Sequence, residues 1–515
     1  PPWVNIEMDI TGILSEKNPE IFIRKISAPQ VKKISTKILD DNKMLRFVYN
    51  EESIWAAATK DFLGGVQNYP LLQKQRNNLY KCVLTNSLLI SNNKGFVGLV
   101  HPEGVYDDPN GQELRNEIYQ RLQYHFQFKN ELILFSEVHH ETIYGIHIYS
   151  GAKNEINFKS INNLFHPSTI DSSFINDGKS QVSGLKIKDI VSGKMTWNVK
   201  PHRDRVIKFS ESELTILGET FENIKDGGIA KLVSIHSVQV INVLRKLSKF
   251  KGRLEEYEYY STDGWNEKIA VDNNIIKRCT MQPSNDQLEL VYSGPHFFVS
   301  TPFYKTPREI CKLNSDYDII DLEKIPEDYL PLTNYIPDED IQIFGNRITG
   351  LKNGTRWIDN YKVAFAEMLS IAGERTLQPF IMPPNVTHLG TVRSIQFSND
   401  RNLIELTGTS SSVLMDFFTK TKGRGHIKPS DVKGLMLGIS NKYYTHLCLR
   451  TLLLNCIVKD YANLWIRNWQ DSFIQDSWSK NDQRLMSIAI LIKEWSWKTP
   501  LRNLYERRQA LVEID

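Results

Sequence analysis

The sequence predicts a protein of mixed α/β class. Between residues 71 and 150, segments with helical spacing of apolar residues alternate with short apolar runs, as in a sheet covered by helices. After about residue 190, short β-rich runs, aromatic residues and Gly/Pro turns dominate, as in "LVYSGPHFFVSTPFYKTP". From about Tyr444 to the end the spacing of apolar residues is helical. We therefore expect an α/β region, then a mixed α+β region, then a helical region.

Length and composition narrow the class of protein further. A chain of 515 residues is too long for one ordinary core and predicts roughly two to four domains. It has 41% hydrophobic residues and no apolar run long enough to span a membrane, so we expect no membrane partner. Its five cysteines include no CxxC pair, which argues against a disulfide framework and a zinc site. This composition fits a reducing cytoplasm.

The first half supplies the elements of the expected sheet in a definite order. Helices are expected over residues 29–41 and 51–63, and a third over 77–91, because apolar residues recur at helical spacing. A turn and a buried strand ending at Pro102 follow, then a helix over residues 112–126. Two β-rich runs, "KNELILF" and "ETIYGIHIYSG", complete the region.

The opening residues, "PPW", match part of an active-site loop. Pro1, Pro2 and Trp3 would supply the last three residues of an Asn-Pro-Pro-aromatic loop, the active site of amino-methyltransferases. Hydrogen-bond acceptors in such a loop localise the lone pair of a planar amine, prolines keep the acceptors aimed, and the aromatic ring stacks on the base. An ordinary turn is the alternative. We expect the chain to be cut inside this motif and to begin without a leader.

The spacing of later motifs resembles the gamma-class adenine-specific DNA methyltransferases found in fused restriction–modification enzymes and phage-defence methylases. In that family the loop is followed by an Asn-Leu-Tyr helix, a Gly turn, a strand ending in Pro, a Leu-Arg helix, a strand ending in Phe and a final strand. The matching segments are "NLY" at 78–80, Gly95, "GLVHP" to Pro102, "ELRNEI" at 113–118, "LILF" to Phe135, and "TIYGIHIY" at 142–149.

The resemblance implies a methyl donor, S-adenosyl-L-methionine, and a role for single residues. Pro2 would touch the donor, and Tyr80 and Val83 would flank the same pocket. Phe135 would stack on the extruded adenine opposite Trp3, because every base presents a π-face. Packing in the core is the alternative for Tyr80 and Phe135. The pair His139–His140 is read as a solvated turn, with no metal ligand set.

The family places its DNA-recognition region after the catalytic domain, and residues 191–440 occupy that place. Clustered cations release counter-ions from DNA, and glycines let backbone amides approach phosphates. Candidate contacts to double-stranded DNA are Arg375, Arg393, Lys420, Lys422, Arg424 and Lys428. A solvated basic loop is the alternative for residues 420–428. Pro383–Pro384, followed by Asn385, is read as structural.

We thus predict three regions. Residues 1–190 form the C-terminal half of a Rossmann-like methyltransferase sheet, residues 191–440 a target-recognition domain, and residues 441–515 a truncated helical region. The donor-binding strand–turn–helix is not apparent, since Gly64–Gly65 follows a helix, so we expect this part to be inactive alone. The predicted function is site-specific methylation of adenine in prokaryotic DNA, with other defence or restriction subunits as further partners. Two alternative functions remain: a non-catalytic DNA-specificity protein on the same scaffold, and a methyltransferase that acts on RNA or on protein amides.

Overall fold

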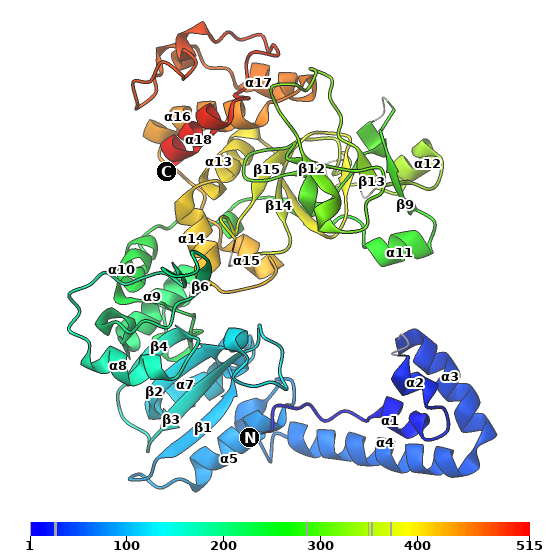
Figure 1. Cartoon of the computed structure of the whole chain (residues 1–515), viewed down its shortest axis with the longest axis vertical. Coiled ribbons are helices and arrows are strands. Elements are labelled where there is room, and N and C mark those ends of the chain that lie inside the picture. Colours follow the sequence, from blue (N-terminus) through cyan, green and yellow to red (C-terminus); the bar gives the residue numbers. More distant parts are fainter. Residues whose placement is uncertain (1, 25–27, 285–286, 349, 352–353, 371–372) are drawn as a thin grey trace. The chain divides into compact units, whose positions relative to one another are not determined.

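The computed structural model describes residues 2–24, 28–284, 287–348, 350–351, 354–370 and 373–515. The chain divides into two compact units, Pro1–Lys249 and Phe250–Asp515 (Figure 1). Both contain helices and sheets, so the expected mixed α/β class is confirmed. Within the described residues, none of the helices combines the length and apolar character needed to cross a membrane.

The first unit begins with four helices, α1 (Ile10–Ser15), α2 (Glu20–Ile23), α3 (Ala28–Asp41) and α4 (Lys43–Gly64). Leu14, Ile21 and Leu45 form their small shared core. Asn42 caps α4 by accepting a hydrogen bond from the backbone N–H of Leu45 at 3.0 Å. The helices expected over 29–41 and 51–63 are both confirmed, as parts of α3 and α4.

A five-stranded sheet forms the centre of the first unit (Figure 1). Its order is β1 (Val97–Pro102), β3 (Ile143–Tyr149), β2 (Leu122–Lys129), β4 (Asn157–Leu164) and β7 (Ile207–Ser210). Strand β3 is antiparallel to both of its neighbours, so β1 and β2 run in the same direction. Strand β4 is parallel to β2, and β7 is antiparallel to β4.

Two of the predicted elements in this region are wrong. The helix expected over 112–126 ends at Arg121 as α7 (Gln112–Arg121), and "LQYHF" belongs to β2. The side chains of this segment alternate between the two faces of the sheet, with a period of two residues. The same few apolar residues also fit helical spacing, so the sequence pattern did not separate the two structures. The run "KNELILF" is not a strand, because it forms a 3-10 turn, Asn130–Leu132, followed by a loop.

Helices cover the two faces of this sheet differently. Tyr80 on α5 (Leu79–Ile90), Tyr106 on α6 (Gly104–Asp107) and Tyr119 on α7 pack on one face. The other face carries an apolar cluster, to which α8 (Ser168–Ile175) contributes Ile170. The expected helix over 77–91 and the strands ending at Pro102 and Tyr149 are confirmed.

The first unit continues beyond residue 190, where we expected the catalytic part to end. A hairpin of β5 (Lys186–Lys188) and β6 (Met195–Trp197) precedes β7. Helices α9 (Glu211–Phe221) and α10 (Val238–Leu247) follow, and α9 begins with a capping box formed by Ser210 and Glu213. Strand β7 therefore completes the sheet from a part of the sequence assigned to DNA recognition.

The second unit is built around an antiparallel sheet of order β15 (Pro379–Met382), β14 (Lys362–Ala366), β17 (Val392–Gln396) and β8 (Tyr260–Thr262). Every residue of β14, β15 and β17 is buried. Shorter pairs surround this sheet, among them β9 (Ile276–Met281) with β13 (Thr333–Pro337). Helices α13 (Asp400–Ser410) and α14 (Val413–Thr421) follow β17. The mixed α+β character expected for this region is confirmed.

The region after residue 440 is helical only in part. Helices α16 (Asn441–Asn455), α17 (Ala462–Asn468) and α18 (Leu504–Ile514) are present, but residues 476–503 contain one short 3-10 turn, Ile488–Ile490. Indole N–H groups hold this irregular segment to carbonyls, as Trp495 donates to Cys456 O at 2.9 Å and Trp497 to Ile325 O at 2.8 Å. These two tryptophans, within the part expected to be helical, thus fix a loop.

Candidate functional site

The segment that follows Pro1 lies against the sheet of the first unit. Trp3 donates its indole N–H to Val100 O on β1 at 3.1 Å, and Leu79 donates its backbone N–H to Val4 O at 3.0 Å. The Pro-Pro-Trp segment is therefore next to both the Asn-Leu-Tyr helix and the strand "GLVHP". Pro1 itself lies outside the described residues, and Pro2 is exposed.

Three aromatic rings meet beside this segment. The ring centroids of Trp3 and Phe135 are 5.8 Å apart at an interplanar angle of 64°. Tyr144 on β3 lies 5.7 Å from Trp3 and 5.0 Å from Phe135. A base held between two parallel rings needs them about 7 Å apart, twice the carbon contact distance of about 3.5 Å. The predicted clamp residues are thus brought together, but they touch edge to face.

The loop that carries Phe135 is held at its base by one buried amide. Asn130 donates from its side chain to Phe135 O at 2.8 Å and to Val138 O at 3.0 Å, and accepts from the Phe135 N–H at 3.0 Å. Ile133 in this loop has a φ of 51°, a left-handed conformation that a β-branched residue rarely adopts. The side chain of Phe135 remains 42% exposed on this fixed loop.

The residues expected to contact S-adenosylmethionine have different surroundings. Val83 is half-buried, whereas the ring of Tyr80 is buried and stacked on His101, with centroids 5.4 Å apart. Burial and the nearby Glu103 raise the pKa of Tyr80 above its usual value. Tyr80 is thus a core residue, and its buried ring does not fit a contact with the methyl donor.

A buried polar cluster that no motif in the sequence indicated lies on the face of the sheet opposite the Trp3 rings. His125 Nε2 lies 2.9 Å from Glu103 Oε2, and His147 Nε2 lies 3.2 Å from Glu103 Oε1. Both histidines are fully buried. Each is isolated in the sequence, so only the alternation of β2 and β3, which places them on one face, could have indicated the cluster. The adjacent pair His139–His140 lies outside it, in a turn, and His140 is 3.3 Å from Glu131.

The electrostatics of this cluster follow from burial and close contact. Burial would raise the pKa of Glu103, but the contacts with His125 and His147 outweigh it and hold this pKa well below its usual value. Burial lowers the pKa of His147, although Glu103 opposes the effect. The carboxylate is therefore ionised and concentrates negative charge against two imidazoles.

The residues expected to contact DNA lie close to carboxylates of the second unit. Arg375 Nε is 3.9 Å and Lys420 Nζ 3.8 Å from Asp416. Arg393 lies 2.6 Å from Asp263, and its side chain is 8% exposed. A phosphate would have to compete with these carboxylates, and a neutralised cation contributes little to counter-ion release.

The basic loop after α14 is organised around Asp431. Lys422 lies 3.6 Å and Arg424 3.2 Å from this carboxylate, which also accepts the backbone N–H of Lys428 at 3.0 Å. Burial lowers the pKa of Lys422 to about 8, and its side chain is 8% exposed. The side chain of Lys428, in contrast, is exposed. The loop is thus partly a structural ion-pair network, with Lys428 at its surface.

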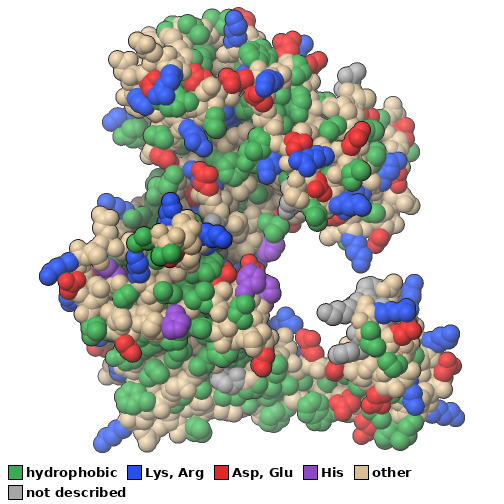
Figure 2. All heavy atoms as spheres, in the orientation of Figure 1, with side chains coloured by type: hydrophobic (Ala, Val, Ile, Leu, Met, Phe, Trp, Pro, Cys, Tyr) green, Lys and Arg blue, Asp and Glu red, His purple; other side chains and the backbone are tan. Residues whose placement is uncertain are grey.

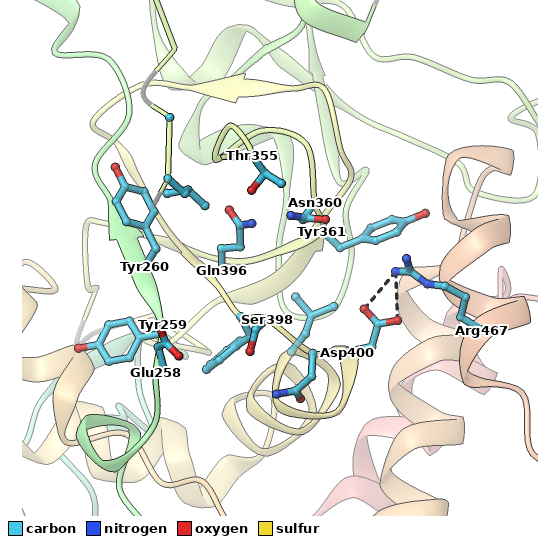
Figure 3. A pocket seen from close by; sticks show the side chains of 15 residues that line it. Glu258, Tyr259, Tyr260, Thr355, Asn360, Tyr361, Gln396, Ser398, Asp400 and Arg467 are labelled. Atoms are coloured by element: carbon cyan, nitrogen blue, oxygen red, sulfur yellow. Dashed lines mark hydrogen bonds and ion pairs between the residues drawn. The ribbon is translucent and has the colours of Figure 1, made fainter. Parts of the chain in front are cut away.

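A pocket of about 1060 Å³ opens in the second unit (Figure 3). Its wall contains Tyr260 on β8, Gln396 on β17 and Asn360, and Figure 3 shows the amides of Asn360 and Gln396 facing the same part of the pocket. The Oε1 atom of Gln396 is buried and has no hydrogen-bond partner among the described residues. An ion pair between Asp400 and Arg467, 3.0 Å long, closes one side. Amides and tyrosines of this kind can bond to and stack on bases.

Charge is mixed over the visible surface. On the face drawn in Figure 2, Lys and Arg side chains alternate with Asp and Glu side chains over both units. The whole chain has 63 Lys and Arg against 60 Asp and Glu residues, a net charge of +3. Any DNA contact would therefore depend on local groups of cations, since the net charge is small.

The solved structures that resemble this chain include two restriction enzymes, both of low similarity. One is the type IIG restriction endonuclease BpuSI, at 13% identity and a TM-score of 0.25, over 79% of this chain and 48% of that one. The other is the type IIL restriction–modification enzyme MmeI in complex with DNA, at 10% identity and a TM-score of 0.33, over 89% of this chain and 51% of that one. This chain thus spans about half the length of each. No family model and no curated protein matches the sequence.

Proposed function

We propose that this chain forms the adenine-binding wall and the DNA-recognition part of a site-specific DNA methyltransferase in a restriction–modification or phage-defence system. The enzyme would move a methyl group from S-adenosylmethionine to the exocyclic amine of adenine. The cluster of Trp3, Phe135 and Tyr144 carries the proposal. Trp3 is far along the sequence from the other two rings, and the family resemblance assigns Trp3 and Phe135 to the two faces of an extruded base.

The chain's own residues would hold the base. The bond from the indole N–H to Val100 O fixes the edge of Trp3, so its ring forms a steady platform. Phe135 sits on a loop pinned by Asn130 and would open from its edge-to-face contact to admit the adenine. Stacking on an aromatic side chain contributes about 1–3 kcal/mol per base. The two rings therefore offset part of the cost of extruding the base from the duplex.

The second unit would supply contacts to the DNA. Lys428 is the exposed member of the predicted set of cations, and Lys420 is 31% exposed. The amides of Gln396 and Asn360 in the pocket are the side chains that we propose for contacts with base edges. Support for this assignment is that both side chains line a pocket beside β8 and β17.

The first experiment is methyl transfer by the full-length natural protein. Plasmid DNA is incubated with S-adenosylmethionine that carries a labelled methyl group, and its nucleosides are then separated. We expect label in N6-methyladenine, and loss of most of it in Trp3→Ala, because one stacking platform is removed. Trp55→Ala is the matched control, since Trp55 is an exposed tryptophan on α4. Label in another base, or in RNA or protein alone, would overturn the proposal.

A second candidate function is a DNA-specificity protein that does not catalyse. The direct contact between Trp3 and Phe135 favours it, because the two rings fill the place of a base. Binding of DNA that contains 2-aminopurine at the target adenine separates the two. Extrusion of the base raises its fluorescence, and Phe135→Ala should then reduce the signal. Tight binding without a fluorescence change would favour the non-catalytic function.

A further inference from the structure

The buried cluster of Glu103, His125 and His147 is built by the register of three strands. His147 on β3 is directly opposite His125 on β2, so their Cβ atoms are cross-strand neighbours, about 5 Å apart. The next place on this face is Gly145. A Cβ at Gly145 would lie 2.4 Å from Glu103 Oε1, so the glycine leaves the space that the carboxylate occupies. Both imidazoles face that carboxylate.

A chain of polar contacts orients the ring of His125 toward Glu103. Asn162 donates its amide to Ile235 O at 3.0 Å, so its Oδ1 faces the hydroxyl of Ser160 at 3.3 Å. The hydroxyl of Ser160 can donate to Asn162 while its oxygen lies 2.8 Å from His125 Nδ1, which holds one edge of the imidazole. The other ring nitrogen, His125 Nε2, faces Glu103 Oε2 at 2.9 Å.

The nitrogen and oxygen atoms that Glu103, His125 and His147 offer all lie within 4.8 Å of one another, close enough to surround one ion. We propose that Glu103, His125 and His147 bind one divalent transition-metal ion, with Zn²⁺ as the best fit. Two imidazole nitrogens and one carboxylate form a known ligand set for zinc. The outer hydrogen bond from His125 to Ser160 is the kind that orients a ligating imidazole and increases its basicity. The inference is independent of methyl transfer.

The distances suit coordination after small shifts. Ligands at about 2.0–2.1 Å from a tetrahedral ion are about 3.4 Å apart. The two carboxylate–imidazole distances, 2.9 and 3.2 Å, are slightly shorter than that. The side-chain amide of Gln127 lies 3.3 Å from Glu103 Oε2, and turning this amide over would offer its oxygen as a fourth ligand.

The place of the site in the fold indicates a structural ion. Both histidines are fully buried and the side chain of Glu103 is 15% exposed, which leaves no room for a substrate. The ion would tie the turn after β1 to β2 and β3. His147 also stacks on His101, with centroids 3.8 Å apart, and His101 stacks on Tyr80. The metal would therefore stiffen the sheet beneath the Asn-Leu-Tyr helix.

Metal titration of the full-length protein tests this proposal. The protein is stripped with a chelator and titrated with Zn²⁺ by calorimetry, and Co²⁺ loading is followed by visible absorption. We expect one ion per chain, a Co²⁺ spectrum without a thiolate charge-transfer band, and a higher Tm when the metal is bound. X-ray absorption of the zinc-loaded protein should show nitrogen and oxygen neighbours at about 2.0–2.2 Å. No binding by the stripped protein, or a sulfur shell, would overturn the proposal.

Variants locate the ion. Glu103→Gln and His125→Asn should each lower the affinity at least tenfold, and Ser160→Ala should lower it about 10–100-fold through the orientation of His125. His101→Asn is the matched control, a buried histidine of the same stack whose Nε2 bonds Tyr149 OH at 3.0 Å, and it should retain binding. Unchanged affinity in both ligand variants would place the ion elsewhere and overturn the assignment. Where a variant does not fold, the titration and absorption of the wild-type protein decide.

Discussion

Asn78 and Asn5 are joined by a side-chain hydrogen bond of 3.1 Å, from the Asn78 amide to Asn5 Oδ1. The same Asn78 side chain caps α5, because its oxygen accepts the backbone N–H of Tyr80 at 3.3 Å. One residue thus begins the Asn-Leu-Tyr helix and holds the segment that carries Trp3. This explains physically why the two motifs go together: the position of the aromatic platform depends on the helix cap.

Substitution of Asn78 separates these two roles. Asn78→Asp keeps the oxygen that caps the helix but loses the amide donor to Asn5, whereas Asn78→Ala loses both. We expect Asn78→Ala to lower the free energy of unfolding by about 1 kcal/mol and Asn78→Asp to leave it nearly unchanged. Both should weaken the 2-aminopurine signal. Chemical denaturation and fluorescence measure the two effects, and a normal signal in Asn78→Asp would refute the coupling.

Gly408 allows α13 and α16 to pack closely in the second unit. A Cβ at this position would lie 2.4 Å from Thr451 Oγ1 and 2.7 Å from a methyl of Leu447. Gly408→Ala should therefore destabilise the unit by about 1–3 kcal/mol through overpacking. Gly425→Ala is the control, because among the described residues no atom beyond its chain neighbours lies within 4 Å of an added Cβ. Its stability should change by no more than about 0.5 kcal/mol. Urea unfolding compares the two variants.

His388 makes the second unit sensitive to acid. Burial lowers its pKa to about 4, and the charges of Lys362 and Arg393 act in the same direction, whereas its bond to Leu389 O opposes them. Between pH 6.5 and 4, His388 is protonated in the unfolded chain but remains neutral in the folded unit. Stability therefore falls as pH decreases through this window, by on the order of 2 kcal/mol at pH 5 for this residue.

The check is urea unfolding at pH 7 and pH 5. His388→Gln keeps an amide that can bond to its neighbours but does not titrate in this range. Its stability at pH 7 is expected to be lower than that of the wild type, and its loss between pH 7 and 5 to be smaller. An equal loss in both proteins would show that His388 does not contribute to the acid sensitivity.

Arg450 joins α16 to the irregular C-terminal segment and to α18. Its guanidinium donates to Asp476 Oδ1 at 2.9 Å and to Glu513 Oε2 at 2.8 Å, and all three side chains are at most 6% exposed. Arg450→Met would leave two buried carboxylates without their cation, at a cost of about 3–5 kcal/mol. The triple variant with Asp476→Asn and Glu513→Gln should recover part of this loss. Thermal unfolding measures both, and a loss below 1 kcal/mol in Arg450→Met would contradict the expectation.

Exposed and buried lysines of the basic loop should differ in their effect on DNA binding. Lys428→Ala removes an exposed cation, so the slope of log K against log salt should fall by about 1 if it contacts a phosphate. Lys422→Met removes a buried cation that faces Asp431, so it should lower stability and leave the salt slope unchanged. Fluorescence anisotropy over a range of salt concentrations measures the slopes. The reverse pattern would show that the loop opens to bind DNA.

Much of the local structure could be predicted from residue patterns. The helices over 29–41, 51–63 and 77–91, the strand ending at Pro102 and the final strand over 142–149 follow from apolar spacing. The family resemblance also implied that Trp3 and Phe135 lie close together, and their rings are in contact. The errors, at "LQYHF" and "KNELILF", lie where a few apolar residues fit both a period of 2 and a period of 3.6.

The sequence alone determined the mixed α/β class, these elements and their order, because local propensity and periodicity act over a few residues. Only the tertiary structure decided which side chains meet. His125 and His147 are 22 residues apart and share a site because β2 and β3 pair in that register. Arg393 looks like a free cation in the sequence, yet Asp263, distant along the chain, neutralises it. Register and long-range ion pairs depend on how the whole unit packs, and no local window of residues contains that information.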